Sequence, residues 1–316
     1  MRTVEYLTDP TLGPLYYPGL VTALLVAALC APLSVLVVLK RLAFVGQGVS
    51  HAAFGGVGIA VVIAATTGAS LFGVVGQGVV GASCIGAALL IWWLSDRGSG
   101  AHGGAGATRH ADTAIGLVLA GSMALGLLLH RWAGEMALAA DRLGPPSLES
   151  VLFGSVWEAG WSSAVAAGVL LALVLGGLAW WRRPLLFWAF DGAAAEASGV
   201  RTGRMRLVLL VLLGLAVLAA MRLAGVVLAT ALLILPGVTA LELSRRLWPV
   251  VLWSFGLAVL GIALGIVVSF EAGLATGPSI VFAQIALYVP VRLGHAWLRR
   301  GRSSSSASAS NGSGAG

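Results

Sequence analysis

Apolar residues in this sequence form long unbroken runs that are separated by short polar connections. A helix needs about 20 apolar residues to cross the hydrocarbon core of a bilayer. The runs of suitable length are Leu20–Leu39, Phe44–Ala65, Leu71–Leu94, Thr113–Leu129, Ala159–Trp181, Leu207–Met221, Val226–Leu241, Val250–Phe270 and Ile280–Trp297. The run Val226–Leu241 is short and contains Pro236, as is typical of a tilted or broken helix, so eight or ten crossings also fit the pattern. The sequence therefore predicts an all-α, polytopic transmembrane bundle of about nine helices.

The composition agrees with this fold class. Of 316 residues, 59% are hydrophobic and 10% are charged, whereas soluble domains carry roughly 25% charged residues. The formal net charge is +7, but the basic residues fall in short clusters between apolar runs, as orientation in a bilayer requires. These observations exclude a soluble domain and argue against nucleic acid as a partner. Cys30 and Cys84 lie in separate apolar runs without ligand-type spacing, which favours buried packing.

The basic clusters occupy alternate connections, and this pattern predicts an orientation. The clusters are Lys40-Arg41, Arg97 with Arg109, five arginines within 182–206, Arg245-Arg246 and Arg299-Arg300. Cytoplasmic connections carry an excess of Lys and Arg. We therefore expect a plasma-membrane protein with its N-terminus outside the cell and its C-terminus in the cytoplasm. The predicted parts are an extracellular segment, 1–18, a transmembrane domain, 19–298, and a disordered cytoplasmic tail, 299–316, rich in Ser and Gly.

Two connections are long. Residues 95–111 are Gly-rich and contain His102 and His110 without a carboxylate or thiol cluster, which favours a solvated linker over a metal sensor. Residues 182–206 include an amphipathic stretch that is expected to form a short helix on the membrane surface. At the N-terminus, acids and prolines stand where a signal peptide would have an apolar core, so we expect no cleavage there.

One ionisable side chain lies well inside a predicted span. His51 follows Arg41 by ten residues, which places it roughly 15 Å from the basic end of its helix and near the bilayer midplane. Gln47 and His51 are spaced i, i+4 and share one face of the helix, which Gly55 and Gly58 continue. An ionisable group at this depth indicates a functional site, although a neutral histidine hydrogen-bonded between helices fits the spacing equally well. Neutral imidazole is a good ligand for zinc and similar divalent metals, whereas glutamine is a poor one.

Five segments, in order, carry a likeness to a known family. They are KRLAFVGQGVSHAAFGGVGIA from Lys40, DTAIGLVLAGSMALGLLL from Asp112, LESVLFGSV from Leu148, the block from Ala193 to Arg246 that contains Gly225 and Pro236, and LATGPSIV with Gly277 and Pro278. These segments resemble those of the integral-membrane permease subunits of metal-ion ABC importers, the ABC-3 family that takes up zinc, manganese and iron. The resemblance runs from about Gly19 to about Leu298. From chemistry alone, the last of these segments is a turn that leads into a helix, because proline is tolerated in a first helical turn.

The resemblance implies a permease that forms a homodimer, binds two cytoplasmic ATPase subunits and receives a divalent metal ion from an extracellular binding protein. It implies a translocation pathway at His51 and Gln47. It also implies an ATPase-coupling turn after the Pro236 helix, from Gly237 to Pro249, with Glu242, Ser244, Arg245 and Arg246 exposed. The chain has no Gly-x-x-x-x-Gly-Lys-Ser/Thr loop, which agrees with a non-enzymatic subunit whose partners hydrolyse ATP and which holds no permanently bound cofactor.

At one position the sequence departs from the family. Gln47 stands where the family usually has aspartate, so the anionic oxygen of a transient metal pair is replaced by a neutral carbonyl oxygen. A related permease for a chelated metal or another small cofactor therefore remains an alternative interpretation. A secondary transporter would need carboxylates in mid-span for its coupling ions, and an intramembrane zinc protease would need a pattern such as His-Glu-x-x-His. Neither is present in the sequence.

Overall fold

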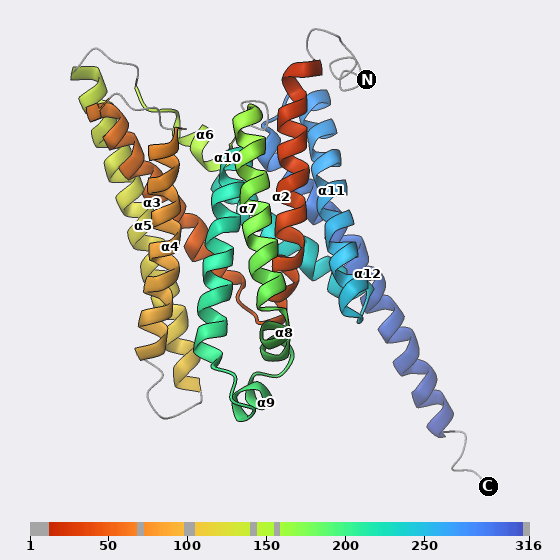
Figure 1. Cartoon of the computed structure of the whole chain (residues 1–316). Helices are drawn as coiled ribbons and strands as arrows, with labels where there is room; N and C mark the ends of the chain where they lie inside the picture. The colour runs from red at the N-terminus through yellow and green to blue at the C-terminus, as the bar shows by residue number, and fades with distance from the viewer. Residues whose placement is uncertain (1–12, 68–72, 98–104, 140–143, 155–158, 312–316) are drawn as a thin grey trace.

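The structure is a computed structural model that describes residues 13–67, 73–97, 105–139, 144–154 and 159–311 (Figure 1). All regular secondary structure in these ranges is α-helical. The helices are α2 (Gly13–Leu39), α3 (Ala43–Thr67), α4 (Val74–Arg97), α5 (Ala105–Ala139), α6 (Leu148–Phe153), α7 (Trp161–Trp180), α8 (Arg182–Phe190), α9 (Gly192–Ala197), α10 (Thr202–Leu243), α11 (Leu247–Ala272) and α12 (Thr276–Asn311). The predicted all-α transmembrane bundle is confirmed.

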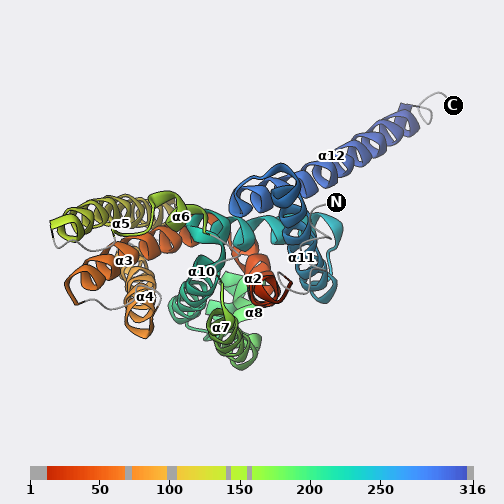
Figure 2. The same cartoon turned by 90° about the horizontal axis from the view of Figure 1, so that it is seen from above.

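Within the described ranges, eight helical segments are long and apolar enough to cross a membrane. They match the first eight predicted spans closely, and the start of α12 overlaps the ninth, Ile280–Trp297. The long helices stand side by side in both perpendicular views (Figures 1 and 2), and the chain enters the bundle at one end and leaves it at the other. This arrangement agrees with a number of crossings near nine.

The helix α10 contains two spans that run in opposite directions. In its first half, Leu218 lies against Gly81 near the start of α4, whereas in its second half Gly237 lies against Ser34 near the end of α2. The reversal occurs at Gly225, whose φ of 65° is strained for any residue with a side chain. A Cβ on Gly225 would stand 2.2 Å from the carbonyl oxygen of Leu152 in α6. Glycine is therefore required twice at this position, once for the backbone angle and once for the contact with α6.

The helices α11 and α12 form a tight hairpin. Gly273 ends α11 in the left-handed conformation, and the Ser269 hydroxyl donates a hydrogen bond to the carbonyl of Leu274 at 2.7 Å. The hydroxyls of Ser269 and Thr276 are also hydrogen-bonded to each other, at 3.2 Å. Gly277 and Pro278 then occupy the first turn of α12, where the missing N–H of proline costs no helical hydrogen bond. The turn predicted at this position is confirmed.

Two stretches differ from the sequence prediction in extent. The helix α12 continues to Asn311, into the Ser-rich segment predicted to be disordered, and α5 begins at Ala105, seven residues before Asp112. Extending an existing helix fixes one residue for each hydrogen bond gained, so helices often continue past the point where composition suggests an end. Residues 1–12 and 98–104, with His102, lie outside the described residues.

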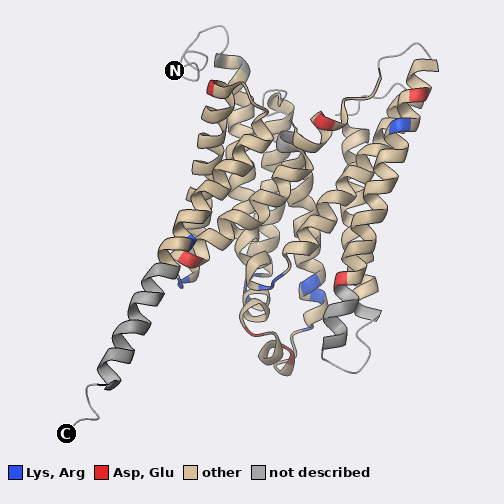
Figure 3. Ribbon diagram, turned by 180° about the vertical axis from the view of Figure 1, so that it is seen from behind, with Lys and Arg blue, Asp and Glu red and all other residues tan. Residues whose placement is uncertain are grey.

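Most described Lys and Arg residues gather toward one end of the bundle, whereas Asp and Glu occur at both ends (Figure 3). We call the end where α2 finishes the basic end, because the exposed Arg41, Arg182, Arg183 and Arg246 lie there. The other end holds α6 and the α11–α12 turn, where Glu149 and Glu271 are exposed. The gathering of basic residues at one end follows the pattern of basic clusters in the sequence.

Candidate functional site

Glycines allow α3 to pack closely against α4 and α5. A Cβ on Gly55 would come within 3.0 Å of the Ser122 carbonyl oxygen in α5, and one on Gly58 within 2.9 Å of the Gly126 Cα. On the next face, a Cβ on Gly56 would come within 2.7 Å of the Ser83 side chain in α4. Small residues at such contacts let backbones approach closely, which is how helices associate in lipid. Gly55 and Gly58 thus permit the close approach of the neighbouring helix α5.

Gln47 and His51 lie on α3, near its beginning at the basic end. Both side chains are partly buried, while Ser50 beside them is fully buried and donates to the carbonyl of Gly46 at 2.9 Å. The Nδ1 atom of His51 is buried and has no hydrogen-bond partner among the described residues. A satisfied packing histidine would use both ring nitrogens, whereas here one imidazole nitrogen has no partner among the described residues.

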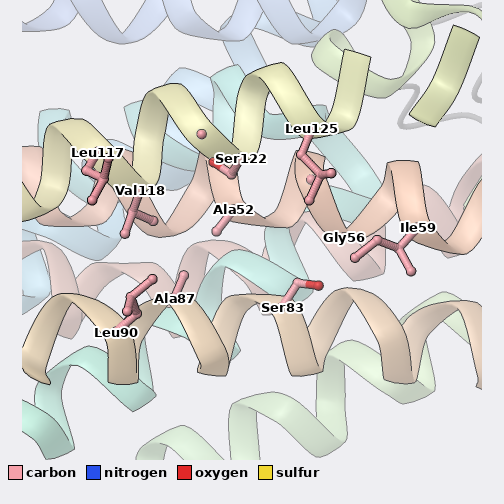
Figure 4. A pocket seen from close by; sticks show the side chains of 12 residues that line it. Ala52, Gly56, Ile59, Ser83, Ala87, Leu90, Leu117, Val118, Ser122 and Leu125 are labelled. Carbon is pink, nitrogen blue, oxygen red and sulfur yellow. The ribbon is translucent and has the colours of Figure 1, made fainter. Parts of the chain in front are cut away.

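A cavity of about 310 Å³ lies beside this face, between α3, α4 and α5 (Figure 4). Its walls are apolar except for the hydroxyls of Ser83 and Ser122, and the latter donates to the carbonyl of Leu119 in its own helix. Neither Gln47 nor His51 lines it, although Ala52 does. The cavity therefore offers a dication no charged or imidazole ligand.

The described residues contain no group of three or more His, Cys, Asp or Glu side chains that could hold a metal ion. Cys30 and Cys84 are both fully buried free thiols, as predicted. One copy of the chain thus presents a single imidazole with a neighbouring amide on α3, which is too few ligands for a closed metal site.

Comparison with known proteins places the chain in a family. A sequence profile described as the ABC 3 transport family matches residues 14–294. The chain belongs to this family. It is 26% identical over 287 residues, covering 90% of this chain and 95% of the relative, to a probable iron transport system membrane protein of Haemophilus influenzae. It is 30% identical over 296 residues, covering 91% of this chain and 90% of the relative, to the manganese transport system membrane protein MntC of Halalkalibacterium halodurans.

Solved structures agree on the fold. The chain superposes on the structure described as PsaBC from Streptococcus pneumoniae in complex with Fab with a TM-score of 0.71, at 22% identity, covering 91% of this chain and 93% of that chain. A putative metal-chelate type ABC transporter in an inward-facing conformation gives a TM-score of 0.63 at 18% identity, covering 91% and 90%. This ABC 3 family member is therefore a multi-pass membrane protein with a known permease fold.

The residues predicted for ATPase coupling do not all lie in one turn. In this ABC 3 family chain the turn itself comprises Ser244, Arg245 and Arg246, which are exposed or partly exposed between α10 and α11. Gly237 is buried inside α10, where a Cβ would meet the Ser34 backbone at 2.6 Å. Pro236 lies beside it within the same helix.

The expected exposure of Glu242 needs correction. Its side chain is 19% exposed, because Arg292 of α12 donates to Oε1 and the Nδ1 of His295 lies 3.0 Å from Oε2. Glu242 thus joins the end of α10 to α12. The family motif residue Asp112 is exposed on α5.

Sequence reasoning missed a buried polar link between α2 and α11. The hydroxyls of Ser34 and Ser254 lie 2.9 Å apart, and each also lies within hydrogen-bonding distance of the Ala31 carbonyl oxygen, at 2.8 and 3.1 Å, so one hydroxyl can donate to this carbonyl while the other donates to its partner hydroxyl. Isolated serines in two apolar runs are the only sequence signal, and the pairing spans 220 positions. Gln284 in α12 is another buried amide, whose Nε2 donates to the carbonyls of Leu257 and Ala258 at 3.3 Å.

The short helices α8 and α9 form a projection at the basic end (Figure 1). They occupy the connection predicted to contain a surface helix. The ammonium of Lys40, just after α2, lies 4.4 Å from the ring centroid of Trp188 in α8, a favourable cation–π contact. Burial lowers the pKa of Lys40, and the carboxylate of Asp191 partly opposes this shift. Asp191 also caps α9 by accepting from the Ala194 N–H at 2.9 Å.

Proposed function

We propose that this chain is the membrane permease of an ABC importer for a divalent transition metal, with manganese, zinc or iron as the cargo class. The family match over residues 14–294 supports the permease role. Curated relatives named for manganese, zinc and iron transport support the cargo class. The observation that carries the site is the buried, unpartnered Nδ1 of His51 on α3.

The site works as a transient contact in this proposal. One imidazole and one neutral amide oxygen hold a dication weakly, and conduction requires an ion to leave as well as to enter. Because one copy supplies too few ligands, water or a second copy of the chain completes the coordination. A homodimer that brings two α3 helices to one pathway would supply two imidazoles.

The basic end faces the cytoplasm, following the inside-positive bias of Lys and Arg. There the ATPase partners meet the permease. Two elements are exposed for that contact, the turn Ser244–Arg246 and the helix α9, on which Glu196 and Ala197 are exposed. The cation–π contact of Lys40 with Trp188 links the α8–α9 projection to α2. A displacement of α9 is therefore transmitted to the spanning helices. An extracellular metal-binding protein docks at the other end.

The decisive test replaces His51 with alanine in the complete transporter. We expect metal uptake at limiting concentration to fall about 10-fold or more, in the range that disturbed metal ligation produces. The matched control is Thr66→Ala on the same helix, because Thr66 is exposed and bonds only within α3. Uptake should be measured with radioactive manganese and zinc at equal expression. Unchanged uptake by the His51 variant would show that His51 serves only in packing.

A second candidate cargo, a chelated metal, is favoured by Gln47, because an amide lacks the charge that attracts a bare dication. Uptake competition distinguishes the two. A free-ion carrier is inhibited by other bare dications, and a chelate carrier is inhibited by the metal-free chelator. In the free-ion case, Gln47→Asp should lower KM, because a carboxylate adds an anionic ligand.

A further inference from the structure

A second and larger cavity, of about 580 Å³, lies at the basic end between α2, α7, α8 and α11. Its floor is made by fully buried side chains, including Ala31 and Leu185. Its rim includes Trp248 and Leu252, which are 79% and 68% exposed. The cavity therefore opens to the outside of the bundle formed by one copy of the chain. No residue of α3 lines it, so it is separate from the His51 site.

The depth of the cavity corresponds to one leaflet. Its lining on α2 begins at Ala28 and ends at Leu36, close to the last residue of the helix, Leu39. At 1.5 Å per residue, Ala28 lies roughly 16 Å from that helix end, which is about half of a 30 Å hydrocarbon core. An acyl chain entering from the headgroup region of this leaflet would reach the same depth.

The mouth of the cavity is basic. Arg182, at the junction of α7 and α8, belongs to the lining, is exposed, and forms no ion pair within the described part of the chain. Arg246 is exposed directly before Leu247, which also lines the cavity. No carboxylate belongs to the lining. Apolar walls below an unpaired arginine match the two ends of a phospholipid, and basic pockets between spanning helices bind anionic headgroups. Trp248 at the rim fits an interfacial aromatic position.

We propose that this cavity binds one anionic phospholipid of the leaflet at the basic end. An acyl chain fills the apolar part between α2, α7 and α11, and Arg182 holds the phosphate. An occupant is expected on physical grounds, because an unfilled apolar cavity loses the packing contacts of its entire lining. The lipid bridges α7 and α11 across α2.

The test counts retained lipid by native mass spectrometry. The full chain is delipidated in a neutral detergent and then titrated with phosphatidylglycerol or phosphatidylcholine. We expect the wild-type chain to retain one phosphatidylglycerol in preference to phosphatidylcholine. Arg182→Gln should reduce this preference about fivefold, the factor expected for one basic residue at the membrane surface. Ala28→Phe, which fills the cavity, should reduce the retention of both lipids.

Arg183→Gln is the matched control, because Arg183 is exposed beside Arg182 but does not line the cavity. This variant should keep the wild-type preference. Equal retention of the two lipids by the wild-type chain would overturn the proposal. It would also be overturned if Arg183→Gln lost as much preference as Arg182→Gln, since the effect would then be general surface charge. The Arg182→Gln and Arg183→Gln variants still test the proposal if Ala28→Phe does not fold.

Discussion

The contact between α3 and α5 and the contact between α2 and α11 hold helices together by different means. The first brings backbones together at Gly55, Gly58 and Gly126, and the one hydroxyl there, on Ser122, bonds within its own helix. The second joins side chains, through the Ser34–Ser254 pair. In lipid, close packing and hydrogen bonding are alternative sources of helix association. The comparison shows that at the contact between Gly55, Gly58 and Gly126 the helix carrying His51 is fixed against α5 by shape rather than by a side-chain hydrogen bond.

The largest effect is expected for Gly58→Ala. The new methyl would stand 2.9 Å from the Gly126 Cα and 3.0 Å from its carbonyl oxygen, so α3 and α5 must separate. We expect a loss of about 1–3 kcal/mol in the free energy of unfolding, as for overpacked sites, measured by titration with denaturing detergent. Gly86→Ala on α4 is the control, because its Cβ would meet nothing within 4 Å. Equal stability of the two variants would contradict packing by shape.

An intermediate effect is expected at the serine pair. A double-mutant cycle of Ser34→Ala and Ser254→Ala should give a coupling energy near 0.6 kcal/mol, the average for interhelical hydrogen bonds in a membrane. The same detergent titration supplies the four free energies of unfolding. Strictly additive losses would show that each hydroxyl acts through the Ala31 carbonyl alone.

The smallest effect is expected for Ser122→Ala. The Ser122 hydroxyl donates to Leu119 of its own helix at 3.2 Å, so its removal leaves the α3–α5 contact intact. We expect a change within about 0.5 kcal/mol, as at positions without a special role. A loss as large as that of Gly58→Ala would mean that a polar bond holds α3 after all, and the comparison would fail.

Much of this fold follows from hydropathy. The predicted span Val226–Leu241 corresponds to a helical segment from Gly225 to Leu243, and Ala159–Trp181 to one from Trp161 to Trp180. These agree because the length of an apolar run and the bilayer thickness are directly related. The common face of Gln47 and His51 follows with the same certainty from helical periodicity.

Partnerships between helices could not be predicted in this way. Nearly every side chain in an apolar run is compatible with lipid or with a neighbouring helix, so composition does not specify which serines meet. The pairing of Ser34 with Ser254 and the partial burial of Glu242 by Arg292 depend on tertiary packing alone. The missing Nδ1 partner of His51 is likewise a property of the assembled bundle.

The contact of Gly225 with α6 has a consequence for biogenesis. The ribosome completes α6 before it reaches Gly225, so the Leu152 carbonyl is already present when the chain must turn back into the bilayer. The two spans of α10 can therefore insert as a hairpin against α6, which is already present. A bulkier residue at the reversal would obstruct this docking step during synthesis, before any cargo could be carried.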